Sequence, residues 1–226
     1  MNTAIIVAAG KSERMGANID KAFASLGERP VIGWSLRAFE QCPEINQIVL
    51  VVRKDQQVAA KSVCRMYGIS KIHAVVAGGS RRQDSVRAGL AAVDADTRTV
   101  VIHDGARPFV TPELIAAVLK ACKRNCASAA AAPIWDTVKS VGRANMVERT
   151  EDRAKLWTVQ TPQAFPLSML IRAYKEVEAR KQVVTDDTSA VEMIGEQVKL
   201  VEWLRPNIKI TTPEDLPVAA ALISLV

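Results

Sequence analysis

Residues 5–16 of the chain, Ile-Ile-Val-Ala-Ala-Gly-Lys-Ser-Glu-Arg-Met-Gly, decide both the fold class and where a site is expected. The apolar run before Gly10 has the composition of a buried strand. Because Gly10 has no Cβ, the loop after it can bring backbone N–H groups close to phosphate oxygens. Lys11, Arg14 and Lys21 add positive charge to the same loop. The stretch therefore predicts a strand followed by an anion-binding loop.

This loop matches neither of the common nucleotide-binding signatures. A GxxxxGK[ST] loop would need a glycine five residues before Gly10, and a GxGxxG loop needs three glycines where only Gly10 and Gly16 are present. These differences argue against an ordinary P-loop NTPase and against a dinucleotide-binding dehydrogenase.

Composition narrows the class further. A length of 226 residues suits one domain, so we expect residues 1–226 to form a single unit. Hydrophobic residues make up 49% of the chain and aromatic residues only 4%, which is typical of a parallel sheet covered by helices. The net charge of +6 comes without Lys/Arg blocks, which favours small phosphate ligands over nucleic acid.

Two further observations concern the compartment. No apolar run approaches the roughly 20 residues of a membrane-spanning helix. The four cysteines are scattered and no signal peptide is recognisable, so we expect a cytoplasmic protein with reduced thiols.

Strand-like and helix-like segments alternate along most of the chain. Strands are expected over 3–8, 47–52, 71–76, 99–103, 127–132, 199–202 and 208–211, and helices over 31–41, 55–67, 80–93, 112–125, 166–181, 188–194 and 213–225. This order predicts an α/β fold with a doubly wound, mostly parallel sheet. The polar stretch after Pro133 is expected to form a projecting arm with a small hairpin, over 138–141 and 145–149.

Three loops follow predicted strands and should meet at one edge of the sheet, where such folds bind ligands. They span residues 8–21, 78–85 and 103–108. In the second loop, Gly78 and Gly79 precede a helix, and a helix N-terminus suits an anion or a base edge. The alternative is a flexible turn with Ser80 as N-cap. Ser85 lies in the first turns of that helix, where its hydroxyl would either contact a ligand or cap the backbone.

The third loop begins with His103 and Asp104. A carboxylate at the end of a buried strand, beside phosphates, is a good Mg²⁺ ligand. The alternative is that Asp104 pairs with Arg107 and only fixes the loop. We interpret His103 as a core histidine or one that supports its neighbours, because nothing in the loop requires a base.

Seven motifs, in order and spanning residues 3 to about 222, together resemble the 2-C-methyl-D-erythritol 4-phosphate cytidylyltransferases (the IspD family) of the non-mevalonate isoprenoid pathway. Each motif is weak alone, but seven in order are specific. They are Ala8-Ala9-Gly10 with Arg14-Met15, Gly78-Gly79 with Arg82 and Ser85, His103-Asp104 with Ala106-Arg107-Pro108, Asp136-Thr137-Val138-Lys139, Leu156-Trp157 with Thr161-Pro162-Gln163, Thr185-Asp186-Asp187 with Ala190-Val191-Glu192, and Asn207-Ile208-Lys209 with Pro213-Glu214-Asp215-Leu216.

The resemblance implies a Rossmann-like fold of the nucleotide-diphospho-sugar transferase type and a reaction of CTP with methylerythritol phosphate that releases pyrophosphate. It implies Mg²⁺ as cofactor, with Asp104 as the metal ligand, and a homodimer formed through an arm over residues 137–157. The catalytic positions it implies are Arg14, Lys21 and Lys209. The nucleotide-binding positions are Ala8, Ala9, Gly10, Lys11, Gly79, Ser85 and Asp104, and the acceptor-binding positions are Arg107, Thr137, Thr161, Thr185 and Arg153, the last reaching across the dimer.

The chain departs from the family pattern at three places. Asp20-Lys21-Ala22 replaces Pro-Lys-Gln, so an acid stands beside the implied catalytic lysine. Ser80 stands where an acidic residue is usual, and Trp135 is unusually large for its place beside the acceptor motif.

Three other functions are alternatives to cytidylyl transfer onto methylerythritol phosphate. A cytidylyltransferase for another polyol phosphate, such as ribitol 5-phosphate, would share the CTP motifs and differ on the acceptor side. A nucleotide-binding protein without catalysis would not need Arg14, Lys21, Asp104 and Lys209 together. A NAD-dependent oxidoreductase is a fold-level alternative that the missing GxGxxG argues against.

Overall fold

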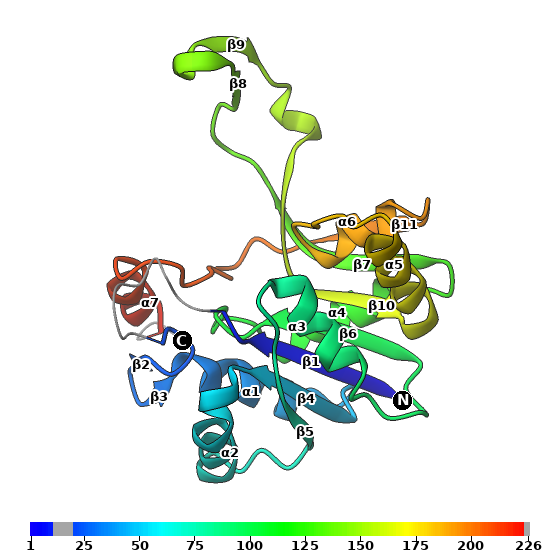
Figure 1. The fold of residues 1–226 in the computed structure, drawn as a ribbon. Coiled ribbons are helices and arrows are strands. Elements are labelled where there is room, and N and C mark those ends of the chain that lie inside the picture. Colours follow the sequence, from blue (N-terminus) through cyan, green and yellow to red (C-terminus); the bar gives the residue numbers. More distant parts are fainter. Residues whose placement is uncertain (11–19, 224–226) are drawn as a thin grey trace.

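The computed structural model describes residues 1–10 and 20–223. It is built around a seven-stranded sheet, and Figure 1 shows how the elements are arranged around it. The strand order is β11-β7-β10-β6-β1-β4-β5, and every neighbouring pair is parallel except those of β10, which is antiparallel to both β6 and β7. The predicted α/β class with a mostly parallel sheet is confirmed. The strands are β1 (Asn2–Ala8), β4 (Gln47–Val52), β5 (Ile72–Ala77), β6 (Thr99–Asp104), β7 (Cys126–Pro133), β10 (Trp157–Pro166) and β11 (Gln197–Glu202).

Helices cover both faces of the sheet, as the doubly wound prediction requires. Alternate residues of β1 point to opposite faces: Ile6 joins the core under α1, α2 and α4, and Ile5 joins the core under α3, α5 and α6. Both side chains are fully buried. The helices are α1 (Val31–Gln41), α2 (Gln57–Met66), α3 (Arg82–Leu90), α4 (Pro112–Ala121), α5 (Leu167–Ala179), α6 (Asp187–Glu192) and α7 (Asp215–Ile223).

The sequence did not predict β10, although this strand lies between β6 and β7 in the sheet. Its first half is largely exposed, and its pairing with β7 is irregular between Val159 and Gln163. Pro162 falls within that irregularity, where a proline costs no ladder hydrogen bond. Residues 161–165, which include Thr161-Pro162, are buried in the sheet.

Several element ends also differ from the predictions. Helix α3 starts at Arg82 with Arg81 as N-cap, because the Asp84 carboxylate accepts from the Arg81 N–H (3.2 Å) and from the Ser80 hydroxyl (3.1 Å). Residues 208–211 form no strand; they lie beside the loop after β6, where the N–H of Ile210 donates to the carbonyl of Ala106 (2.8 Å). The structure also has a short pair that was not expected, β2 (Ser25–Leu26) with β3 (Arg29–Pro30).

The predicted arm is present and stands away from the main sheet (Figure 1). Its antiparallel strands are β8 (Lys139–Val141) and β9 (Val147–Thr150), close to the expected hairpin. Met146 and Val147 at its tip are 70% and 59% exposed. Across residues 1–10 and 20–223, no helix combines the length and the apolar character needed to cross a bilayer.

Candidate active site

The three predicted loops meet at the carboxyl ends of β1 and β6, where they line a cleft of about 140 Å³. Small residues form one part of the cleft and cationic side chains another. The lining residues are Val7, Ala8, Ala9, Gly10, Lys21, Ala22, Gly79, Ser80, Arg81, Arg82, Ser85, Asp104, Ala106 and Lys209. Lys11 and Arg14 lie outside the described residues, so their predicted roles remain predictions.

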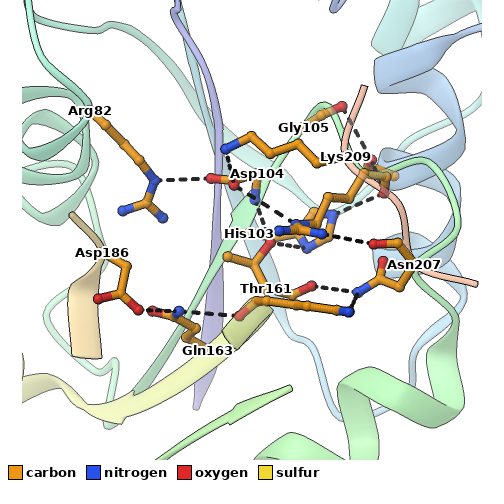
Figure 2. A network of polar contacts seen from close by, with 12 residues as sticks. Arg82, His103, Asp104, Gly105, Thr161, Gln163, Asp186, Asn207 and Lys209 are labelled. Carbon is orange, nitrogen blue, oxygen red and sulfur yellow. Dashed lines mark hydrogen bonds and ion pairs between the residues drawn. The ribbon is translucent and has the colours of Figure 1, made fainter. Parts of the chain in front are cut away.

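Asp104 lies in the cleft between the cationic side chains of Arg82 and Lys209 (Figure 2). Its Oδ1 accepts from Arg82 Nε at 3.0 Å, and its Oδ2 accepts from Lys209 Nζ at 2.6 Å. Arg107 Nε lies 3.9 Å from Oδ2. Both interpretations of Asp104, as a metal ligand and as the partner of an arginine, therefore agree with this geometry: Asp104 lines the cleft and is also paired with Arg82.

Charge keeps Asp104 ionised although it is only 7% exposed. Burial alone would raise the pKa of its carboxyl, but the nearby cations Arg82, Lys209 and Arg107 outweigh burial and hold that pKa well below its usual range. The cleft thus presents one fixed anion surrounded by cations.

His103 and Thr161 fix the backbone behind Asp104. The N–H of Asp104 donates to Thr161 Oγ1 (3.0 Å), which also lies 3.2 Å from His103 Nδ1. His103 Nε2 lies 3.2 Å from the carbonyl oxygen of Arg107, and a carbonyl can only accept. Complete burial lowers the pKa of His103 to about 3, so the ring is neutral with its proton on Nε2 and accepts at Nδ1 from the Thr161 hydroxyl. The prediction of a supporting core histidine fits this geometry.

Arg82 connects Asp104 to the helices on the far side of the loop. Its Nη2 lies 2.7 Å from Oδ2 of Asp187, the first residue of α6. The other oxygen of Asp187 accepts from the hydroxyl of Tyr174 on α5 at 2.6 Å. No role for Asp187 or Tyr174 was predicted, although Asp187 stood in one of the quoted motifs; their separation of 83 and 70 residues from Asp104 hides the contact from local patterns.

The glycine loop packs tightly on the end of β1. A Cβ on Gly78 would lie 2.3 Å from the Cβ of Ala9, and a Cβ on Gly79 would lie 2.4 Å from the Cβ of Asp84. Ser85 Oγ accepts from the N–H of Gly79 (3.2 Å) and donates to the carbonyl of Arg81 (3.2 Å). Of the two predicted uses of the Ser85 hydroxyl, the structure shows the one that holds the backbone.

The carboxylate of Asp20, beside Lys21, forms an ion pair with Arg53. Asp20 Oδ2 lies 3.3 Å from Arg53 Nη1, and its Oδ1 accepts from the N–H of Ala22 at 3.1 Å. Burial raises the pKa of Asp20, against the effect of this hydrogen bond and of Arg53. The positive charge of Arg53 therefore offsets the negative charge of Asp20. Lys21, the residue after Asp20, lines the cleft.

None of the five predicted acceptor residues lines the cleft. Thr161 is buried behind Asp104, and Thr185 hydrogen-bonds Ser189 through its hydroxyl at 3.1 Å. Thr137 and Arg153 belong to the arm, where Arg153 Nη1 donates to the carbonyl of Trp135 at 2.5 Å. Arg107 lines an adjoining hollow of about 340 Å³ together with Trp135, which is 72% exposed.

The donor set of the cleft fits a magnesium ion bound together with a substrate. Among the residues that the structure describes, no group of three or more His, Cys, Asp or Glu side chains could hold a metal by itself. Asp104 is the one carboxylate among the residues described as lining the cleft. Mg²⁺ in proteins is commonly held by one or two carboxylates plus substrate phosphates, which matches a lone Asp104 beside cations.

Comparison with known proteins gives one consistent family. The model of the family described as IspD, 2-C-methyl-D-erythritol 4-phosphate cytidylyltransferase, matches residues 2–224. Proteins of that name from Pelotomaculum thermopropionicum and Alkaliphilus metalliredigens are 44% and 41% identical, over 97% and 98% of this chain and 93% and 92% of theirs. The crystal structure of 4-diphosphocytidyl-2C-methyl-D-erythritol synthase from Anaerococcus prevotii superposes with a TM-score of 0.87 at 34% identity, covering 99% of this chain and 98% of that one. The chain therefore belongs to the 2-C-methyl-D-erythritol 4-phosphate cytidylyltransferase family of nucleotidyltransferases.

Proposed function

We propose that this enzyme joins CTP to 2-C-methyl-D-erythritol 4-phosphate, giving 4-diphosphocytidyl-2-C-methyl-D-erythritol and pyrophosphate. An oxygen of the acceptor phosphate attacks the α-phosphorus of CTP, and the bond from that phosphorus to the β-phosphate bridging oxygen breaks. Pyrophosphate leaves with the electron pair. The observation that carries the proposal is the cleft in which Asp104, Arg82 and Lys209 meet beside the small residues that follow β1.

The acceptor phosphate is already anionic at neutral pH, so the reaction needs no activating base. Its barrier comes from repulsion between anions and from charge that develops on the α-phosphate oxygens and the leaving group. Lys21 and Lys209 line the cleft and supply positive charge there. We assign them, with Arg14, to the triphosphate and its transition state.

We assign the cytosine and ribose to the small end of the cleft. Ala8, Ala9 and Gly10 present backbone groups there; Gly79, in the loop before α3, and Ser85, in the first turn of α3, line the same part of the cleft. Such a narrow site holds a pyrimidine more readily than a purine. Lys11 extends this loop in the sequence and is assigned to the same nucleotide.

Asp104 would hold Mg²⁺ together with phosphate oxygens of CTP. The bound ion would neutralise triphosphate charge and help to align the α-phosphorus. Asp104 Oδ2 is paired with Lys209 in this structure, so Lys209 has to turn toward the phosphates when Asp104 takes up the ion.

The acceptor site is proposed to be completed by a second copy of the chain. The arm over residues 137–157 carries exposed apolar side chains at Val141, Met146 and Val147, which a partner could cover. Arg153 lies on the same arm and would reach the acceptor site of the partner, to which we assign Arg107, Thr137, Thr161 and Thr185 of the receiving subunit.

Mixing two inactive variants tests this arrangement. If Arg153 serves the partner's site, a mixture of Arg153→Ala with Lys21→Ala contains dimers with one intact site and regains activity. A monomer in light scattering, or a mixture as inactive as its components, would refute the exchange. A cytoplasmic location stays a prediction that the four free cysteines support.

The first experiment measures pyrophosphate release from CTP and Mg²⁺, with methylerythritol 4-phosphate and ribitol 5-phosphate in parallel. We expect release with the former; release with ribitol 5-phosphate alone would keep the nucleotide site and overturn the acceptor. Lys209→Met should lower kcat by about 100-fold or more, as expected for the loss of one transition-state contact. Lys199→Met, an exposed lysine on β11 outside the cleft lining, is the matched control and should keep full activity.

A further inference from the structure

Two carboxylates from different elements hold Arg82. Its Nε donates to Asp104 Oδ1 at 3.0 Å, as Figure 2 shows, and its Nη2 lies 2.7 Å from Asp187 Oδ2. The Arg82 side chain is 24% exposed and lines the cleft, whereas Asp187 is completely buried and does not. The guanidinium therefore lies between the reaction cleft and an anion behind it.

Asp187 is a completely buried carboxylate, so its negative charge needs compensating partners. Removing a carboxylate from water costs several kcal/mol unless partners compensate for it. Asp187 has two such partners: the hydroxyl of Tyr174, which donates to Oδ1 at 2.6 Å, and Arg82 at Oδ2. With Tyr174 fixing one oxygen, the other is aimed at the guanidinium, which is the geometry of a group that orients an arginine.

Lys209 is held differently. Within residues 1–10 and 20–223, Asp104 is the one carboxylate in ion-pair contact with it, and its side chain is 33% exposed. A cation with a single carboxylate partner can turn toward an incoming triphosphate, because the triphosphate carries more negative charge than the one carboxylate that the cation leaves. Arg82 would have to leave two carboxylates at once.

We propose that Asp187, supported by Tyr174, is a positioning residue that keeps Arg82 on Asp104 throughout turnover, while Lys209 exchanges from Asp104 to the triphosphate. The inference rests on the proposed cytidylyl transfer and deepens it. Without the anion at position 187, Arg82 is free to follow the triphosphate, and Asp104 loses the partner that orients it once Lys209 has left.

The test compares Asp187→Asn with Asp186→Asn. Asp186 is the neighbouring carboxylate and N-cap of the same helix; it accepts from the N–H of Ser189 at 3.0 Å and does not contact Arg82. Loss of a partner that orients an active-site group typically costs about 10–100-fold in activity. We expect Asp187→Asn to lower kcat by at least about 10-fold with the KM for CTP changed less than about threefold, and Asp186→Asn to lower Tm while keeping kcat.

A second readout does not depend on turnover. An arginine Nε–H fixed in an ion pair exchanges slowly with water, so the Arg82 Nε–H resonance of the wild type should be observable by NMR. It should be lost in Asp187→Asn and kept in Asp186→Asn. If the wild type releases no pyrophosphate but the resonance behaves as expected, the proposed function fails and the positioning contact stands.

Three results would overturn the inference. They are a kcat of Asp187→Asn within about twofold of wild type, an equal loss of kcat in both variants at equal loss of Tm, or an Arg82 resonance unaffected by the substitution. If Asp187→Asn does not fold, Tyr174→Phe removes one hydrogen bond and keeps the ring. It should then give a weaker form of the same kcat effect, and an unchanged kcat in Tyr174→Phe would count against the inference.

Discussion

His103 should make the folded state sensitive to mildly acidic pH. The imidazole is fully buried between Phe39 and the backbone of the loop after β6, with ring centroids of His103 and Phe39 5.1 Å apart. Burial lowers its pKa from 6.5 to about 3. Above pH 6.5 neither state binds the proton, and below it the unfolded chain binds the proton while the folded protein does not.

The free energy of unfolding therefore falls as the pH drops from 6.5 toward 3. Each pH unit in that window costs about 1.4 kcal/mol. At pH 5, His103 alone should remove about 2 kcal/mol of the stability present at pH 7.5. That is a large share of the 5–15 kcal/mol typical of a folded domain.

Urea unfolding between pH 8 and pH 5 measures this loss, and His103→Gln, which cannot titrate, should show a flatter profile. NMR tests the wild type directly. The His103 ring signals should not move down to about pH 4. A His103 titration near pH 6.5, or equal pH profiles of the two proteins, would refute the assignment of a buried neutral ring.

Three further substitutions test the surroundings of the cleft. Thr161→Val leaves the amide at the end of β6 without its acceptor and should cost about 1–3 kcal/mol in urea unfolding, while Thr161→Ser should cost less. Gly78→Ala places a Cβ 2.3 Å from that of Ala9, so we expect a loss of about 1–3 kcal/mol and weaker CTP binding by calorimetry. Arg53→Ala removes the cation paired with Asp20 and should raise the KM for CTP severalfold in steady-state kinetics, with little change in kcat; an unchanged KM would show that the pair does not matter.

The sequence predicted what depends on local pattern. Continuous apolar runs gave β1 and β4 almost to the residue, and the loops after parallel strands were correctly expected to meet at one edge. Residues 208–211 alternate in polarity like a strand, yet they lie along the loop after β6, because the apolar side chains of Ile208 and Ile210 pack with α7 and its neighbours instead of joining a sheet. The alternation of polar and apolar residues indicates which side chains are buried, but it does not indicate whether a sheet or a helix covers them.

The contacts behind Asp104 that were not predicted begin with one element, β10. This strand reverses the sheet direction between β6 and β7, and it brings Thr161 against the amide of Asp104 from 57 residues away. Further along the chain, α6 then packs against α5 and β7 with Asp187 directed at Arg82. A threonine, a proline and two neighbouring aspartates have ordinary uses in turns and caps, so no pattern within residues 161–187 distinguishes those uses from contacts to a distant strand. The charge balance around Asp104 is set by the tertiary fold, and for that reason substitutions at 161 and 187 should affect the cleft although neither residue lines it.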